Sequence, residues 1–310
     1  MQGMSKKDWE EGNSTRSGLL WEIERILKEC SDEELPDVLL MENVPQVHAE
    51  ANRADFDSWL NFLKSKGYWN FWKDLNAKDF GIPQNRDRCF CVSILSKDFV
   101  DFEFPEPVKL EKVMKDYLEE FVDEKYFINT EKAQKLIRKL IDNGLVKQQE
   151  NKKEKIYLGN YYGRHDGYDG SVFHPNGLCK TITHSVGGIA DVLEERIPAN
   201  LNYKKIDKIN IRVAKTIMAR DCKGFNTGFD TQNGVIEFLS SEKVNDNITY
   251  VETQYRIRKL TPKECWRLMG YTDKDFEKAA EVNSNTQLYK QAGNAIVKQV
   301  LMAIFSQLLN

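Results

Sequence analysis

Pro36-Asp-Val-Leu-Leu-Met-Glu-Asn-Val-Pro45 carries the strongest strand signal in this sequence, and the fold prediction starts from it. It is a continuous apolar run that polar residues and proline bring to an end. Such a run is typical of a parallel strand that is buried on both faces of a sheet. The stretch therefore predicts one strand of an α/β core, with Glu42 close to its C-terminal end.

Helices and further strands alternate around this run. Apolar residues recur at the three-and-four spacing of a buried helix face at about 17–30 and 54–65. Strands are predicted at about 68–76 and 88–95. This alternation predicts a doubly wound α/β sheet. The chain supplies only about three strands of it, which is fewer than a stable open sheet usually has.

The pattern changes at about Phe104. Phe104-Pro-Glu-Pro107 predicts a domain boundary, and helices are expected after it at about 110–122 and 130–142. Glycine-rich, aromatic, strand-like segments then continue to about Thr253. A second, smaller and more irregular domain is therefore expected here.

Helical periodicity returns near the C-terminus. Thr261 and Glu264 have the spacing of a capping box, which predicts the start of a helix. The last helix is expected at about 294–308 and is the most apolar in the chain.

The composition indicates a packed, soluble protein. Of the 310 residues, 41% are hydrophobic and 30% are charged, which argues against disorder. No run reaches the roughly 18 apolar residues that a membrane span needs. The first residues, Met1-Gln-Gly-Met-Ser-Lys-Lys-Asp, have no signal-peptide core. We therefore expect a cytoplasmic protein with no membrane partner.

The cysteines do not follow a metal-binding or disulfide pattern. All six occur singly except Cys89 and Cys91, which share one face of a predicted strand. Metal sites usually use C-x-x-C or similar turns, and disulfide scaffolds are shorter and denser in cysteine. We interpret the six as structural thiols and expect no metal.

The net charge of −3 does not indicate a nucleic-acid partner, although charge is unevenly distributed. Residues 203–223 hold seven lysines and arginines against two aspartates. This segment is either a phosphate-facing surface or a solvated charged face, and the sequence alone leaves both open.

Glu42 is the first candidate functional residue. It closes the predicted strand at the edge where open α/β sheets place their ligands. A carboxyl there can hold the edge of a nucleobase, because its acid form donates to a ring nitrogen while its other oxygen accepts from an exocyclic amine. The alternative is a capping role after the strand.

The second candidate is Gln84-Asn-Arg-Asp-Arg88, at the start of a predicted strand. Alternate residues of a strand point the same way, so Arg86 and Arg88 are expected to share a face. Together they would bind one anionic or carbonyl-rich ligand. The alternative is an arginine pair that solvates the end of the strand.

Gln291-Ala-Gly-Asn-Ala-Ile-Val297 is the third candidate. Gly293 and Asn294 are expected at the start of the last helix, where free backbone N–H groups and an amide side chain suit a polar ligand. An ordinary helix start is the alternative.

Taken in order, the motifs of this chain resemble those of a known family. From the N-terminus they are Glu42-Asn-Val, Gln84-x-Arg-x-Arg88, Arg258-x-Leu-Thr-x-x-Glu264 and Gly293-Asn-x-Ile296. Their order and separation resemble the last motifs of the DNA cytosine-5 methyltransferases. The resemblance covers essentially the whole chain.

The resemblance implies an α/β fold. An incomplete doubly wound, Rossmann-like methyltransferase sheet would carry a smaller, irregular target-recognition domain inserted before the C-terminal helices. Residues 1–104 would be the C-terminal part of the catalytic domain, and 105–255 the target-recognition domain that binds DNA. Residues 256–310 would be helices that return to the catalytic domain.

In that family a cysteine thiolate attacks C6 of a cytosine flipped out of duplex DNA, and C5 then takes the methyl group of S-adenosyl-L-methionine. The resemblance implies that Glu42 binds N3 and the amino group of the cytosine. Arg88 would contact the base carbonyl, and Arg86 would support the site. Asn294 and Ala295 would line the cofactor pocket.

Contacts with double-stranded DNA are also implied. Threonine offers short polar contacts, and glycine allows the backbone to approach closely. The DNA-binding candidates are Gly3, Arg16, Thr181, Thr183, Gly187 and Gly188.

The sequence departs from the family pattern at its N-terminus. Gln2-Gly3-Met4-Ser5 resembles the tail of the catalytic loop, whereas the family's Phe-x-Gly-x-Gly cofactor loop and catalytic Pro-Cys do not occur in this sequence. We therefore expect a truncated chain or a split subunit, inactive alone, that a separate N-terminal methyltransferase polypeptide completes.

Two alternatives stay open. One is a non-catalytic DNA-binding remnant or regulator of a restriction-modification system, which would bind duplex DNA without needing the cofactor. The other is a decayed gene or a misplaced start codon. In each case the resemblance implies a bacterial or phage-encoded protein.

Overall fold

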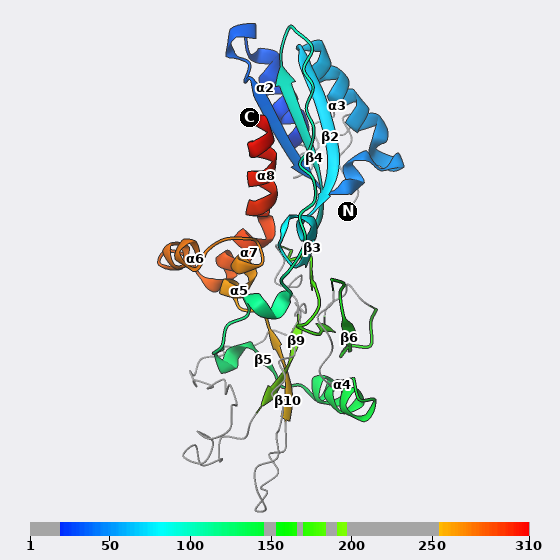
Figure 1. Cartoon of the computed structure of the whole chain (residues 1–310), viewed down its shortest axis with the longest axis vertical. Coiled ribbons are helices and arrows are strands. Elements are labelled where there is room, and N and C mark those ends of the chain that lie inside the picture. Colours follow the sequence, from blue (N-terminus) through cyan, green and yellow to red (C-terminus); the bar gives the residue numbers. More distant parts are fainter. Residues whose placement is uncertain (1–18, 146–152, 166–169, 184–190, 197–253, 310) are drawn as a thin grey trace, which may run out of the picture. The chain divides into compact units, whose positions relative to one another are not determined.

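The computed structural model describes residues 19–145, 153–165, 170–183, 191–196 and 254–309 (Figure 1). Their contacts divide the chain into two compact units. The first unit comprises Met1–Asn76, Asp87–Pro107 and Met302–Asn310. The second unit comprises Ala77–Arg86 and Val108–Leu301. The chain leaves and re-enters each unit, so neither is one continuous segment.

A three-stranded sheet is the centre of the first unit. In order, its strands are β1 (Val38–Asn43), β4 (Asp87–Leu95) and β2 (Tyr68–Asn76). Both outer strands run antiparallel to β4.

The prediction of a parallel strand buried on both faces is wrong for the run 36–45 in this sheet. Strand β1 is antiparallel to β4, and its residues are half-buried or exposed. The central position belongs to β4, in which residues 89–93 are all buried. An apolar run favours a buried strand, but it determines neither how far the strand is covered nor the direction in which it pairs.

Two helices supply the core on one side of this sheet. They are α2 (Leu19–Glu29) and α3 (Arg53–Ser65), which confirm the predicted helices, and α3 packs against β2. Gly67, with a φ of 95°, allows the turn from α3 into β2. The buried residues of this core are Trp21, Leu27, Leu35, Trp59, Leu63 and Tyr68.

A five-stranded sheet organises the second unit. In order, its strands are β5 (Phe127–Ile128), β10 (Gln254–Lys259), β9 (Asp191–Arg196), β7 (Ser171–Phe173) and β6 (Tyr157–Asn160). Neighbouring strands are antiparallel except β7 and β9, which are parallel. A separate parallel pair is formed by β3 (Gln84–Asn85) and β8 (Cys179–Lys180).

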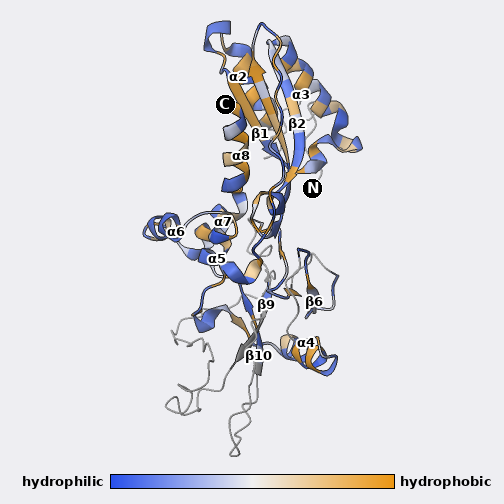
Figure 2. Ribbon diagram, viewed as in Figure 1, coloured by the Kyte–Doolittle hydropathy of each residue, from blue (hydrophilic) through white to orange (hydrophobic). Residues whose placement is uncertain are grey.

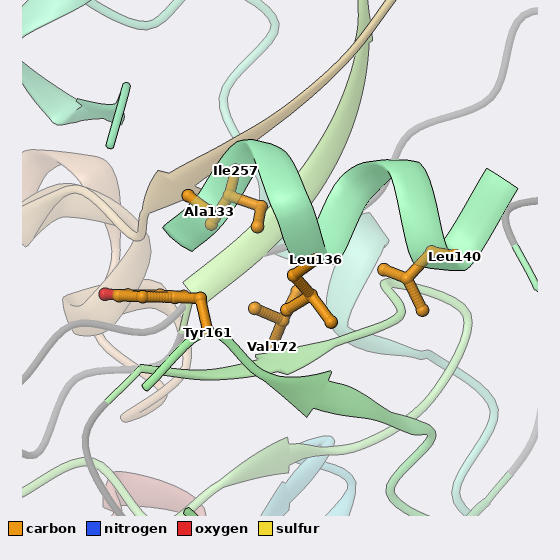
Figure 3. Packing of buried hydrophobic residues seen from close by; sticks show 6 residues of the cluster. All are labelled: Ala133, Leu136, Leu140, Tyr161, Val172 and Ile257. Carbon is orange, nitrogen blue, oxygen red and sulfur yellow. The ribbon is translucent and has the colours of Figure 1, made fainter. Parts of the chain in front are cut away.

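Helix α4 (Glu131–Asp142) packs on this sheet and confirms the helix expected at 130–142. Thr130 caps it, since its hydroxyl accepts a hydrogen bond from the Ala133 amide at 3.2 Å. The helix carries both apolar and polar residues (Figure 2), and it contacts β10 and β6. Figure 3 shows the resulting core, which contains Ala133, Leu136, Leu140, Tyr161, Val172 and Ile257.

The helix expected at 110–122 does not form. This segment contains only the 3-10 helix η6 (Met114–Tyr117). The Met114 amide donates to the Gly177 carbonyl and the Lys115 amide to the Pro175 carbonyl, each at 3.0 Å. An α-helix needs such donors for its own carbonyls. Long-range backbone pairing therefore overrides the local periodicity here.

Four helices follow β10, namely α5 (Pro262–Arg267), α6 (Asp273–Ala280), α7 (Asn285–Asn294) and α8 (Lys298–Leu308). The predicted capping box of Thr261 and Glu264 is present at α5. The last helix begins at Lys298 rather than at 294, because α7 runs through Asn294 and the backbone becomes extended at Ala295. Within the described residues, no helix has the length and apolar character needed to cross a membrane.

The units divide the chain differently from the domains expected at 1–104, 105–255 and 256–310. Residues 77–86 group with the second unit because β3 pairs with β8. Strand β10 lies inside the five-stranded sheet, and only Met302–Asn310 returns to the first unit. Short 3-10 helices complete the connections, namely η2 (Asp32–Glu34), η3 (Pro45–His48), η4 (Glu50–Asn52), η5 (Ala77–Phe80) and η7 (Glu124–Tyr126).

A buried ion pair fixes the start of α5. Nη1 and Nη2 of Arg258 donate to the two carboxylate oxygens of Glu264, both at 2.9 Å, and the two side chains are 3% and 0% exposed. The same carboxylate accepts from the backbone amides of Thr261 and Glu119. A buried charge is tolerated when it is paired and hydrogen-bonded. The pair therefore ties α5 to β10 and to the segment around Glu119.

We predict that Glu264→Ala destabilises the second unit by about 3–5 kcal/mol, because it leaves the Arg258 guanidinium buried without its partner. Glu277 is the matched control, since it pairs with Lys263 while 64% exposed. Glu277→Ala should cost no more than about 1 kcal/mol. Urea unfolding followed by circular dichroism measures both, and equal losses in the two variants would contradict the prediction.

Candidate active site

Glu42 and Arg88 form an ion pair in the first unit. Nε of Arg88 lies 2.9 Å from Oε1 of Glu42, and the side chains are 17% exposed for Arg88 and 21% for Glu42. Nη1 of Arg88 also donates to the Asp87 carbonyl at 2.6 Å, which holds the guanidinium against its own strand. The pair is partly open to solvent and presents an acceptor beside a donor.

The antiparallel register of β1 and β4 brings these two side chains together. Glu42 lies opposite Phe90, and Arg88 precedes Phe90 by two positions on β4. Residues two apart on a strand share a face, so Glu42 and Arg88 lie on the same face of the sheet. Asn43 lies opposite Cys89, and both belong to the other face.

Arg86 is placed differently from Arg88. Strand β3 ends at Asn85 and β4 begins at Asp87, so Arg86 interrupts the strand that the sequence predicts. The expectation that both arginines share a face and bind one ligand is therefore wrong in this structure. The two side chains belong to different compact units.

The guanidinium of Arg86 binds backbone carbonyls inside the second unit. Its side chain is 4% exposed. It donates from Nη1 to Ile182 at 2.6 Å and from Nη2 to Gly293 at 3.0 Å and Ala295 at 2.9 Å. Arg86 thus connects β8 and the end of α7 to β3. Its role in these contacts is to position other groups.

Gln84 is a buried polar residue that sequence reasoning treated only as part of a motif. It is 0% exposed. Its Nε2 donates to the Leu268 carbonyl at 2.7 Å, and its Oε1 accepts from the Ile182 amide at 3.1 Å. The sequence signal for this role is weak, because a glutamine that follows a Gly-Ile-Pro loop is equally compatible with an exposed turn and with a buried position.

Asn294 ends α7 and does not start a helix, which corrects the prediction of free N–H groups at this position. The end of a helix leaves carbonyls free instead. Arg86 takes up the carbonyls of Gly293 and Ala295, as a cation at a helix C-terminus is expected to do. The Asn294 side chain is exposed, and Ala295 is half-buried.

Thr181 and Thr183 lie just after β8 and are both half-buried. The Thr181 hydroxyl donates to the Asn85 carbonyl, which ties it to β3. The remaining DNA-binding candidates lie outside the described residues, as does the cationic segment 203–223. They are Gly3, Arg16, Gly187 and Gly188.

The motifs that supply these residues match one family model along almost the whole chain. That model, described as C-5 cytosine-specific DNA methylase, matches residues 2–310. The chain belongs to this family. Membership implies S-adenosyl-L-methionine as the general methyl donor of the family and DNA as its general substrate.

Named methyltransferases are identical to this chain at about a third of the aligned positions. It is 31% identical over 296 residues to the type II methyltransferase M2.ScrFI of Lactococcus lactis subsp. cremoris, which covers 96% of the chain and 59% of that relative. It is 32% identical over 312 residues to the orphan methyltransferase M.SPBetaI of Bacillus phage SPbeta, with 90% and 67% covered. The chain thus spans 59% to 67% of the length of these two relatives.

Solved methyltransferase structures share the fold. The Entamoeba histolytica methyltransferase EhMeth has a TM-score of 0.52 at 15% identity and covers 100% of this chain and 75% of that one. The S. pombe Dnmt2 methyltransferase has a TM-score of 0.53 at 17% identity, with 95% and 73% covered. At these identities the similarity shows the fold alone, and it confirms the expected α/β, Rossmann-like methyltransferase class.

Four described cysteines of this methyltransferase chain lack the properties of a nucleophile. Burial raises the pKa of the Cys89 thiol to about 12, that of Cys91 to about 11 and that of Cys179 to about 12. Burial also raises the pKa of Cys265 well above its usual range. Because the thiolate is the nucleophilic form, these four thiols are unreactive at neutral pH.

We predict slow alkylation of these four cysteines in the native chain. At pH 8, the raised pKa alone should make Cys91 react about 100-fold more slowly with iodoacetamide than in urea, and burial should add to this. Half-buried Cys30 provides an internal comparison and should be labelled before the other four described cysteines. Peptide mapping by mass spectrometry measures each site, and rapid native labelling of any of the four buried thiols would refute the prediction.

Proposed function

We propose that this chain contributes the base-binding and DNA-recognising part of a DNA cytosine-5 methyltransferase. The reaction is transfer of a methyl group from S-adenosyl-L-methionine to C5 of a cytosine flipped out of duplex DNA. The observation that carries the proposal is the pair of Glu42 and Arg88, joined at 2.9 Å on one face of a sheet, in a chain of this family.

The pair is complementary to the pairing edge of cytosine. In its acid form, the Glu42 carboxyl donates to N3 while its other oxygen accepts from the exocyclic amine. The Arg88 guanidinium donates to the base carbonyl next to N3. Donors at N3 and at the carbonyl stabilise the negative charge that develops in the ring during attack at C6, and this lowers the barrier.

Asn294 and Ala295 are the proposed cofactor-binding residues. The exposed Asn294 amide can both donate to and accept from a polar group of the cofactor. The carbonyls of Gly293 and Ala295 are already bound by Arg86, which therefore holds this turn in shape. When bound, S-adenosyl-L-methionine supplies the electrophilic methyl group.

Most of the proposed target-recognition region, for which we keep the limits 105–255, belongs to the second unit. Thr181 and Thr183 are its proposed DNA contacts within the described residues. The Thr181 hydroxyl donates to Asn85, so its oxygen is left to accept a further hydrogen bond. Because Arg86 binds the Ile182 carbonyl between the two threonines, it would position both.

Exposed apolar surface on the first unit supports binding of a partner that covers it, and the proposed partner is an N-terminal methyltransferase polypeptide. Within the described strands, β1 has β4 on one side and no neighbour on the other. Ile23 and Ile26 of α2 are 43% and 42% exposed, and Met302 and Phe305 of α8 are 58% and 42% exposed. An open strand edge and exposed apolar helix faces are features that proteins usually cover. The same partner would supply the thiolate that the four buried cysteines do not provide.

We expect 5-methylcytosine when this chain is mixed with an N-terminal methyltransferase polypeptide, labelled S-adenosyl-L-methionine and duplex DNA. Glu42→Gln should lower the rate of transfer by about 100- to 1000-fold, because it removes the acid that stabilises the attacked ring. Glu50→Gln is the matched control, since Glu50 is an exposed glutamate on η4 in the same loop region, and it should leave the rate unchanged.

The proposal is rejected if a complex that is assembled by gel filtration and folded by circular dichroism transfers no methyl group. Duplex binding without transfer in that complex would instead support a non-catalytic DNA-binding protein. If Glu42→Gln and Glu50→Gln lower the transfer rate equally, Glu42 has no specific role in the reaction.

A further inference from the structure

The sheet face opposite Glu42 and Arg88 carries a second cluster of polar side chains. Asp74 on β2 and Cys89 on β4 lie directly opposite each other in the strand register. His48 comes from η3, the 3-10 helix that follows β1. One nitrogen of His48, one carboxylate oxygen of Asp74 and the sulfur of Cys89 all lie within 4.8 Å of one another.

We propose that His48, Asp74 and Cys89 form a binding site for a divalent transition-metal ion, Zn²⁺ above all, with a fourth position left to solvent. Imidazole nitrogen, carboxylate oxygen and thiolate sulfur are the ligands that zinc uses in proteins. Hard cations such as Mg²⁺ prefer oxygen ligands alone, so this mixed set selects against them. Carboxylate and thiolate together balance the double charge of the ion.

Hydrogen bonds already hold the three groups together. Nε2 of His48 lies 3.0 Å from both carboxylate oxygens of Asp74. The same carboxylate accepts a hydrogen bond from the Cys89 thiol. The nitrogen, the carboxylate and the sulfur thus already face one another around the position where a metal ion would bind.

Metal binding displaces the proton of the thiol. The Cys89 thiol would lose its proton to solvent, and the neutral His48 imidazole would coordinate through Nε2. The exchange therefore releases about one proton per ion. The raised pKa of Cys89 lowers the apparent affinity near neutral pH and makes binding stronger as the pH rises.

The surroundings fit an ion that enters from one side. His48 and Asp74 are 22% and 38% exposed, whereas Cys89 is buried. The Trp72 ring lies 4.7 Å from the His48 ring and limits its rotation. The sulfur would thus lie inside, and the open coordination position would face the solvent.

The arrangement of the three side chains argues against a catalytic role for the cluster. Asp74 lies between His48 and Cys89, so the imidazole does not act on the thiol, and burial holds the pKa of that thiol at about 12. A structural role follows instead. The ion would fasten η3, which begins three residues after Glu42, to β2 and β4. This inference does not depend on the proposed function.

Titration of the chelator-treated 310-residue chain with Co²⁺ tests the site. We expect saturation at about one equivalent and a near-ultraviolet sulfur-to-cobalt charge-transfer band, with Zn²⁺ displacing Co²⁺ and Mg²⁺ leaving it bound. Cys89→Ser should abolish the band, and His48→Asn or Asp74→Asn should weaken binding at least about tenfold. Zn²⁺ should raise the melting temperature of the wild type but not that of Cys89→Ser.

Cys91→Ser is the matched control, since Cys91 is buried on the same face two residues along β4. It should keep the band and the affinity. Circular dichroism verifies that each variant is folded before titration. A folded wild type without the band, or a band that survives in Cys89→Ser, would overturn the proposal. A band lost equally in Cys91→Ser would overturn it as well.

Discussion

The guanidinium of Arg86 satisfies three backbone carbonyls that belong to two separate segments of the second unit. A buried carbonyl without a donor costs about 1–3 kcal/mol, so the end of α7 and the strand pair of β3 with β8 both depend on this side chain. Only the planar fork of arginine offers donors in several fixed directions. Gln84 completes the arrangement by bonding with both ends of its amide. The proposed Asn294 and Thr181 contacts rest on this support.

Strand register has the corresponding role in the first unit. Because β4 begins at Asp87, the residue on the Glu42 face is Arg88, and Cys89 points the other way. A slip of one residue would exchange these two faces. The same register therefore produces the proposed base-binding pair on one face and the proposed metal ligands, Asp74 and Cys89, on the other. Two chemically different clusters follow from one alignment of strands.

Local signals predicted those elements whose own residues supply the stabilising contacts. The helices at 17–30, 54–65 and 130–142 and the strand at 68–76 were predicted in this way, and the capping box of Thr261 and Glu264 was predicted as well. Predictions failed where distant backbone groups compete for the same donors. In the segment 110–122, Met114 and Lys115 give their amides to residues 175–177, and the break at Asn294 is held by Arg86 from another part of the chain. No local pattern reports such partners.

The sequence by itself determined the family, because the order and spacing of its motifs can be recognised without any knowledge of contacts. It also predicted that Glu42 lies near the end of one strand and that Arg86 and Arg88 lie around the start of another. Only the tertiary structure decided which arginine meets Glu42 and which holds backbone, and only it brought His48 beside Asp74 and Cys89. The physical reason is that strand pairing and buried hydrogen bonds join residues far apart in the chain, and these long-range partners set the direction of each side chain.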